Sequence, residues 1–146
     1  MEICALPSWV DAVFLLDTNV ISELRKGKPK QSTSVREWAA SQPVKTLYLS
    51  SITVLELEIG VQMLLRKDGT QGAQLRRWLD RTRAEFKARI LAFDEAAADR
   101  CAPLYVPNPR SFRDAMIAAT ALAHGLTVAT RNVADFRGVA TVNPFD

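Results

Sequence analysis

One stretch decides the fold of this chain: Phe14-Leu15-Leu16-Asp17-Thr18-Asn19-Val20-Ile21-Ser22-Glu23. Its apolar run is short, and polar residues follow at once, which predicts a buried strand that stops where the chain turns. Asp17 stands at the carboxyl end of this strand. Ligands of open parallel α/β sheets bind in the crevice at the carboxyl ends of the strands, so Asp17 is a candidate site residue.

Strands and helices alternate in the rest of the chain. Apolar or β-rich segments predict four more strands, at 46–50, 90–93, 126–130 and 140–142. Apolar residues at helical spacing predict helices at 19–25, 34–41, 51–65, 71–89, 94–101 and 113–124. Thr18 or Asn19 is expected to cap the first helix, and a proline-rich loop is expected at 104–112. The alternation predicts an α/β domain with a central, mostly parallel sheet flanked by helices.

Composition sets the class of protein. Hydrophobic residues make up 48% and charged residues 24% of the 146 residues, which excludes a disordered chain. No apolar run is long enough to cross a membrane, and the first twelve residues do not resemble a secretory signal, so we expect a cytoplasmic protein. Residues 1–13 are expected to precede a single domain at 14–146. Cys4 and Cys101 have no Cys or His neighbour at metal-ligand spacing, and we expect two free thiols.

The chain is moderately basic, with a formal net charge of +3 and a pI near 9.1. This charge is compatible with a polyanionic partner but does not require one. The predicted helix at 71–89 has a basic face, for which a solvated surface is favoured over a nucleic-acid groove. The face consists of Arg76, Arg77, Arg81, Arg83, Lys87 and Arg89.

Four carboxylates are candidates for chemistry: Asp17, Glu56, Asp114 and Asp135. Each has an ordinary structural role available, such as a turn for Asp17, a helix cap for Asp114, or an exposed position for the other two. Helical spacing puts Glu56 on the side of Ile52, Ile59 and Met63, where a carboxylate is unfavourable unless it is paired or binds a metal.

Asp114 opens an alanine-rich helix that is nearly uncharged and must therefore be buried. If Asp17, Glu56 and Asp114 converge, they repel one another, and a bound divalent cation would keep them ionised. Oxygen ligands without His or Cys favour Mg²⁺ or Mn²⁺ over Zn²⁺. Such a site can hydrolyse phosphodiesters with metal-activated water.

Four segments in unbroken order resemble the PIN-domain ribonucleases: 15–23, 49–60, 114–121 and 130–136. Within this family the chain looks like a VapC-type toxin of the FitB-like branch, from a type II toxin-antitoxin pair. The resemblance implies a PIN fold, RNA cleavage that depends on Mg²⁺ or Mn²⁺, a homodimer, and inhibition by a small cognate VapB-like antitoxin.

The resemblance also implies roles for particular residues. Asp17, Glu56 and Asp114 become catalytic acids, with Asp17 and Asp114 as direct metal ligands. The fourth acid is Asp135, although some relatives have an aspartate at the position of Asn132, so the fourth position stays open between these two. The implied polar supports are Asn19, Thr130 and Asn132, and the implied phosphate contacts are Arg110, Arg113 and Arg131.

Two other functions remain open at this point. A PIN-like module with a weak or idle site could bind nucleic acid or an antitoxin without turnover, and the neutral Asn132 motivates this alternative. A phosphoryl-transfer domain with Asp17 as nucleophile is disfavoured, because haloacid-dehalogenase-like enzymes usually have a second acid where this chain has Asn19.

Overall fold

The structure is a computed structural model, and it describes residues 12–25, 27 and 29–146. Most of the expected extension at 1–13, including Cys4, lies outside the described residues. Cys101 is a buried free thiol. In the described part of the chain, no helix is both long and apolar enough to cross a membrane.

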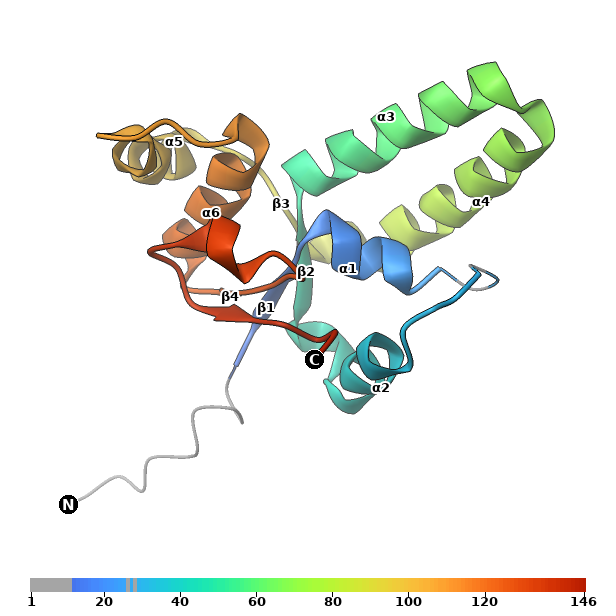
Figure 1. The fold of residues 1–146 in the computed structure, drawn as a ribbon, viewed down its shortest axis with the longest axis horizontal. Helices are drawn as coiled ribbons and strands as arrows, with labels where there is room; N and C mark the ends of the chain where they lie inside the picture. The colour runs from blue at the N-terminus through green and yellow to red at the C-terminus, as the bar shows by residue number, and fades with distance from the viewer. Residues whose placement is uncertain (1–11, 26, 28) are drawn as a thin grey trace.

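A five-stranded sheet forms the centre of the molecule, in the order β3-β2-β1-β4-β5 (Figure 1). Every pair of neighbouring strands is parallel, which confirms the predicted α/β class. Leu16 of β1 is in register with Ala129 of β4, and Asp17 donates its backbone N–H to the Ala129 carbonyl oxygen (2.9 Å). Asp17 and Thr130 therefore leave the sheet side by side. The strands are β1 (Phe14–Leu16), β2 (Leu47–Ser50), β3 (Ile90–Leu91), β4 (Thr127–Ala129) and β5 (Thr141–Val142).

Helices cover both faces of the sheet (Figure 1). Successive strand residues point to opposite faces, so Leu16 packs into an apolar cluster with α1, α2, α3 and α4, while Leu15 packs with α6 on the other face. Both leucines are fully buried. The helices are α1 (Thr18–Glu23), α2 (Thr33–Ser41), α3 (Ser51–Lys67), α4 (Gly69–Glu85), α5 (Glu95–Cys101) and α6 (Phe112–His124).

The structure corrects the boundaries of three predicted helices. Asp17, not Thr18 or Asn19, caps α1, because its carboxylate accepts the Thr18 backbone N–H (2.8 Å). Helix α4 begins and ends earlier than predicted, since Asp68 caps it at its start and a short 3-10 helix at Lys87–Arg89 follows it. Helix α6 begins at Phe112, inside the predicted loop, so Asp114 is its third residue and not its cap.

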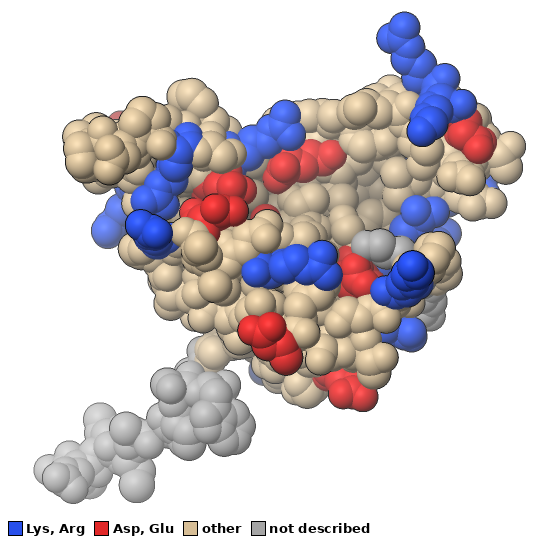
Figure 2. Space-filling view, viewed as in Figure 1, with Lys and Arg blue, Asp and Glu red and all other residues tan. Residues whose placement is uncertain are grey.

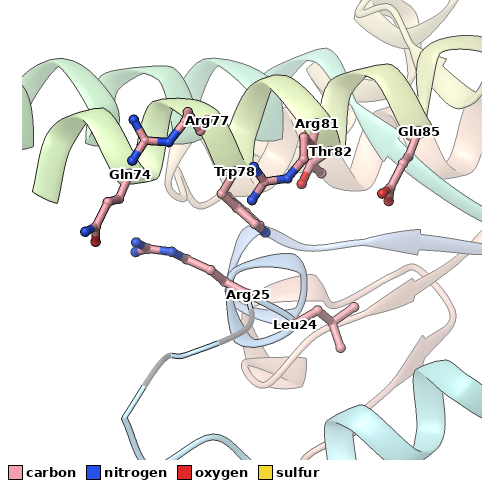
Figure 3. A pocket seen from close by; sticks show the side chains of 8 residues that line it. All are labelled: Leu24, Arg25, Gln74, Arg77, Trp78, Arg81, Thr82 and Glu85. Atoms are coloured by element: carbon pink, nitrogen blue, oxygen red, sulfur yellow. The ribbon is translucent and has the colours of Figure 1, made fainter.

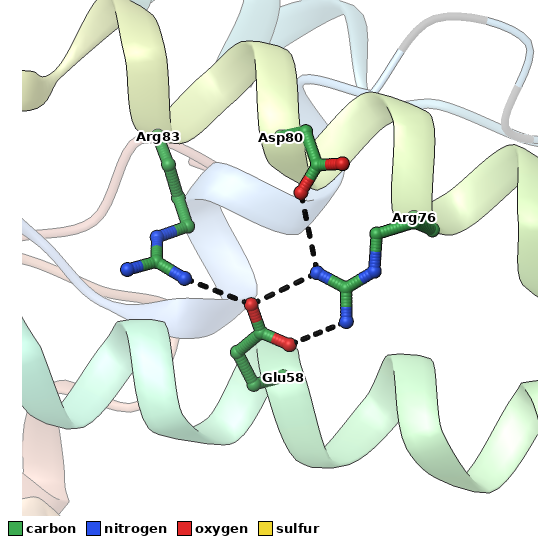
Figure 4. A network of polar contacts seen from close by, with 4 residues as sticks. All are labelled: Glu58, Arg76, Asp80 and Arg83. Atoms are coloured by element: carbon green, nitrogen blue, oxygen red, sulfur yellow. Dashed lines mark hydrogen bonds and ion pairs between the residues drawn. The ribbon is translucent and has the colours of Figure 1, made fainter.

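Helices α3 and α4 form an antiparallel hairpin that extends from one side of the sheet (Figure 1). Glu58 of α3 joins the two helices, because it accepts two hydrogen bonds from Arg76 (2.9 and 2.6 Å) and one from Arg83 (2.9 Å) (Figure 4). These hydrogen bonds, first of all those from Arg76, lower the pKa of the Glu58 carboxyl below its usual value. Two arginines of the predicted basic face are thus neutralised within the hairpin.

Candidate active site

Asp17 lies at the carboxyl edge of the sheet, between the first turn of α1 and the end of β4. Its side chain is only 5% exposed. One carboxylate oxygen accepts the Thr18 backbone N–H, and the other accepts hydrogen bonds from the Thr130 hydroxyl (2.8 Å) and the Asn19 amide (3.2 Å). Three donors from two elements therefore fix the carboxylate in one orientation.

Burial raises the pKa of Asp17 above its usual value, and the charge of Glu56 acts in the same direction. The hydrogen bonds from Thr130, Thr18 and Asn19 oppose this rise, since they stabilise the ionised form. A buried carboxylate with this balance is typical of a functional site. A nearby cation would favour the ionised form of Asp17.

Glu56 reaches the same edge from the second turn of α3. Its Oε1 accepts the Thr18 hydroxyl (2.9 Å), and its Oε2 lies 3.6 Å from the Arg113 guanidinium of α6. The predicted apolar surroundings of Glu56 are wrong in part, because Met63 is 69% exposed and the buried face of α3 runs through Thr53 instead. Polar contacts, not an apolar stripe, hold this carboxylate.

Asp114 and Asp135 both line a polar hollow of about 270 Å³, which Arg110 and Arg137 also line. Asp114 is half-buried in the first turn of α6. Burial, followed by the charges of Asp17, Asp135 and Glu56, raises the pKa of Asp114 to about 6. The four predicted acids are thus close enough to form one electrostatic cluster. In the view of Figure 2, Asp and Glu side chains lie among Lys and Arg side chains on the visible face of the molecule.

The predicted polar supports surround Asp17. Asn19 contacts Asp17 through its amide and accepts the Arg131 backbone N–H (3.2 Å) at its oxygen. Thr130 is fully buried and accepts the Asn132 backbone N–H (3.0 Å) while it donates to Asp17. Asn132 therefore contributes its main chain, and its side chain is exposed.

The three predicted phosphate contacts lie in different surroundings. Arg113 is next to Glu56, and Arg110 lines the hollow and donates to the Arg137 carbonyl oxygen (3.3 Å). The Arg131 guanidinium stacks on the Phe145 ring at 3.9 Å from its centroid. Arg113 and Arg110 therefore lie next to carboxylates of the cluster, while an aromatic ring holds Arg131.

The donor set fits a hard divalent cation, because it consists of carboxylate oxygens that raise one another's pKa values. As they stand, no three His, Cys, Asp or Glu side chains of the described residues are close enough to hold a metal ion together. Mg²⁺ commonly keeps several waters and takes only one or two protein carboxylates. Asp17 and Asp114 could hold such a hydrated ion, with Glu56 and Asp135 acting through water.

Sequence reasoning missed the threonine and serine network beneath Glu56. Thr53 lies 3.2 Å from the Thr18 hydroxyl and 3.3 Å from the Ser50 hydroxyl, and Ser50 caps α3 through the Thr53 backbone N–H (3.0 Å). Ser50 ends β2, next to β1 in the sheet. Its position at a strand end was the available signal, because neighbouring parallel strands place such residues at one edge.

The fold and the site together define an α/β protein with an acidic site at the carboxyl ends of its central strands. The model of the PIN domain family matches residues 14–141. The chain therefore belongs to the PIN-domain family.

Relatives of known name agree with this family. The chain is 37% identical to the VapC ribonuclease Y4jK of Sinorhizobium fredii, over 92% of this chain and 99% of the relative. It is 39% identical to the toxin FitB of Neisseria gonorrhoeae, over 91% of this chain and 99% of the relative.

Solved structures share the fold. The crystal structure of FitAcB from Neisseria gonorrhoeae matches with a TM-score of 0.83 and 39% identity, over 91% of this chain and 99% of that chain. A toxin-antitoxin complex from Klebsiella pneumoniae matches with a TM-score of 0.66 and 28% identity, over 90% of this chain and 98% of that chain.

Proposed function

We propose that this protein is a metal-dependent endoribonuclease that acts as the toxin of a toxin-antitoxin pair. One observation carries the proposal: the four acids lie close enough together at the edge of the sheet that, after burial, the charges of Asp17, Asp135 and Glu56 raise the pKa of Asp114. The similarity to a VapC ribonuclease and to the toxin FitB supports the same activity and role.

Asp17 and Asp114 are the proposed ligands of Mg²⁺ or Mn²⁺. When bound, such an ion polarises a phosphate oxygen and lowers the pKa of a bound water. The chain's own contribution is to hold the carboxylates: Thr130, Asn19 and the Thr18 backbone fix Asp17 in its orientation.

Glu56 is the proposed acceptor for the proton of the attacking water. The Thr18 hydroxyl holds its Oε1, so Oε2 remains to orient water beside Arg113. Arg113 and Arg110, which lie beside carboxylates of the cluster, are the proposed contacts to the phosphodiester. Asp135, which lines the hollow together with Asp114, is the proposed fourth acid, while Asn132 supports Thr130 through its main chain.

The proposal includes three further expectations from the family. A small VapB-like antitoxin is the expected partner, which agrees with the toxin-antitoxin complex of the same fold from Klebsiella pneumoniae. The active form is expected to be a homodimer, and the expected location is the cytoplasm.

Cleavage of RNA by the purified protein tests the proposed activity. We expect cleavage with Mg²⁺ or Mn²⁺, none in EDTA, and a loss of at least about 100-fold in the Asp17→Asn and Asp114→Asn variants. Asp99→Asn, an exposed position in α5, is the control with the same change of charge. Full cleavage in both site variants would refute the metal site. RNA binding without turnover at any metal concentration would support the idle-site alternative instead.

A further inference from the structure

A second polar hollow, of about 430 Å³, lies between the end of α1 and one face of α4. Arg25 follows the end of α1, and Gln74, Arg77 and Arg81 come from α4. Figure 3 shows these side chains around the same space, with Arg25 extending toward Gln74. We call this space the basic hollow. None of the four proposed catalytic acids lines it.

No carboxylate of the described residues forms an ion pair with the arginines of the basic hollow. The ion pairs among the described residues include none with Arg25, Arg77 or Arg81, whereas Arg76 and Arg83 on the neighbouring face of α4 both pair with Glu58 (Figure 4). Arg77 and Arg81 are four residues apart on one helix, where like charges repel. One carboxylate, Glu85, lines the hollow against three guanidinium groups, so the space favours an anion.

Trp78 gives the basic hollow an aromatic wall. It points from α4 toward α1 and also lines the apolar hollow next to it, together with Leu24 and Thr82 (Figure 3). Trp78 is half-buried, because it packs against the apolar core cluster, and part of the residue stays accessible. Guanidinium groups around an aromatic ring form the kind of surface that binds single-stranded nucleic acid, since phosphates contact the arginines and a base stacks on the ring.

The basic hollow lies one short helix away from the catalytic edge. Asp17 caps α1 at its start and Arg25 follows its end, so the two are roughly 12 Å apart along the helix axis at 1.5 Å per residue. A nucleic-acid strand with one phosphodiester at the carboxylates is long enough to reach the basic hollow with nucleotides further along.

We infer that the basic hollow binds the phosphate backbone of the RNA substrate, several nucleotides from the cleaved bond, with Trp78 as a stacking platform. This inference rests on the proposed ribonuclease function, and it assigns Arg25, Arg77 and Arg81 to substrate positioning. These arginines bind substrate and transition state equally, so their loss raises KM and leaves kcat unchanged.

The test compares RNA binding by the full-length protein and an Arg77→Gln/Arg81→Gln variant. The probe is a fluorescein-labelled pool of single-stranded RNA of random sequence, titrated in EDTA at several salt concentrations. We expect the variant to bind RNA at least about tenfold more weakly than the wild type. The slope of log K against log salt concentration should be shallower by about 1.4, at about 0.7 for each lost phosphate contact. With Mg²⁺, KM rises by a similar factor at constant kcat.

The Arg66→Gln/Lys67→Gln variant is the matched control, because it removes two exposed charges at the far end of α3 and leaves the hollow intact. Equal RNA affinity, salt slope and KM in the two variants would overturn the inference. Unchanged RNA binding together with loss of a co-expressed acidic antitoxin would assign the hollow to that protein instead. If the wild-type protein binds RNA through these arginines but cleaves none, the hollow is an RNA-binding site, whereas the proposed ribonuclease function, and with it the assignment of the bound RNA as substrate, fails.

Discussion

Asp114 is the residue at which the charge of the whole site can be measured. Its raised pKa means that the folded protein binds a proton between pH 3.8 and about 6 that the unfolded chain has already lost. The free energy of unfolding of the metal-free protein therefore falls as the pH rises through this window. A neutral side chain at position 114 removes this loss of stability.

We predict that Asp114→Asn raises the Tm of the metal-free protein at pH 7 by roughly 3 °C, or about 1 kcal/mol after solvent screening, and by less at pH 5. Thermal unfolding in EDTA measures the effect, with Asp99→Asn as the control. A lower Tm at pH 7, or an equal gain in the control, would show that burial and the neighbouring acids do not disfavour the ionised Asp114 carboxylate.

The roles of Asp135 and Asn132 in catalysis can be distinguished by replacing each with alanine. Asp135 lines the hollow with Asp114 and contributes to its raised pKa, whereas Asn132 acts through its backbone N–H on Thr130. We predict that Asp135→Ala lowers the rate of RNA cleavage at least about tenfold, while Asn132→Ala changes it less than about threefold. The reverse order would make Asn132 the functional fourth residue.

The elements of the fold were mostly predictable from the sequence. Helical periodicity located α3, and the change from an apolar run to polar residues located the end of β1. Periodicity failed where one residue serves two helices: Asp68 follows α3, and its carboxylate accepts the N–H groups of Thr70 and Gln71 (3.1 Å each) to start α4. In the sequence, Lys67-Asp68-Gly69 indicates only the end of α3. That Asp68 also caps the start of α4 is seen only in the structure.

The α3–α4 hairpin depends on one glycine. A Cβ atom at Gly72 would lie 2.6 Å from the Leu65 Cα, while one at Gly60 would meet nothing within 4 Å. We predict that Gly72→Ala destabilises the protein by about 1–3 kcal/mol through this overlap with backbone. Gly60→Ala, its matched control inside α3, should stabilise by up to about 1 kcal/mol through helix propensity. Urea unfolding measures both, and a stabilised Gly72→Ala variant would show that the hairpin packs less closely.

At the scale of the whole molecule, the order of the strands creates the site. Strand β1 lies between β2 and β4, which brings Ser50, Asp17 and Thr130 to one edge. The sequence predicted that strand ends would share an edge, but not which strands are neighbours, because strand order depends on packing between distant segments. The hydrogen bond from Thr18 to Glu56, which are 38 residues apart, could not be predicted for the same reason.

Calorimetric titration of the metal-free protein with Mn²⁺ at pH 7 tests the central claim that the carboxylates of Asp17 and Asp114 belong to one metal site. Wild-type protein should bind Mn²⁺, Asp17→Asn and Asp114→Asn should each weaken binding at least about tenfold, and Asp99→Asn should match the wild type. Equal Mn²⁺ affinity in the wild type and both site variants would contradict the claim.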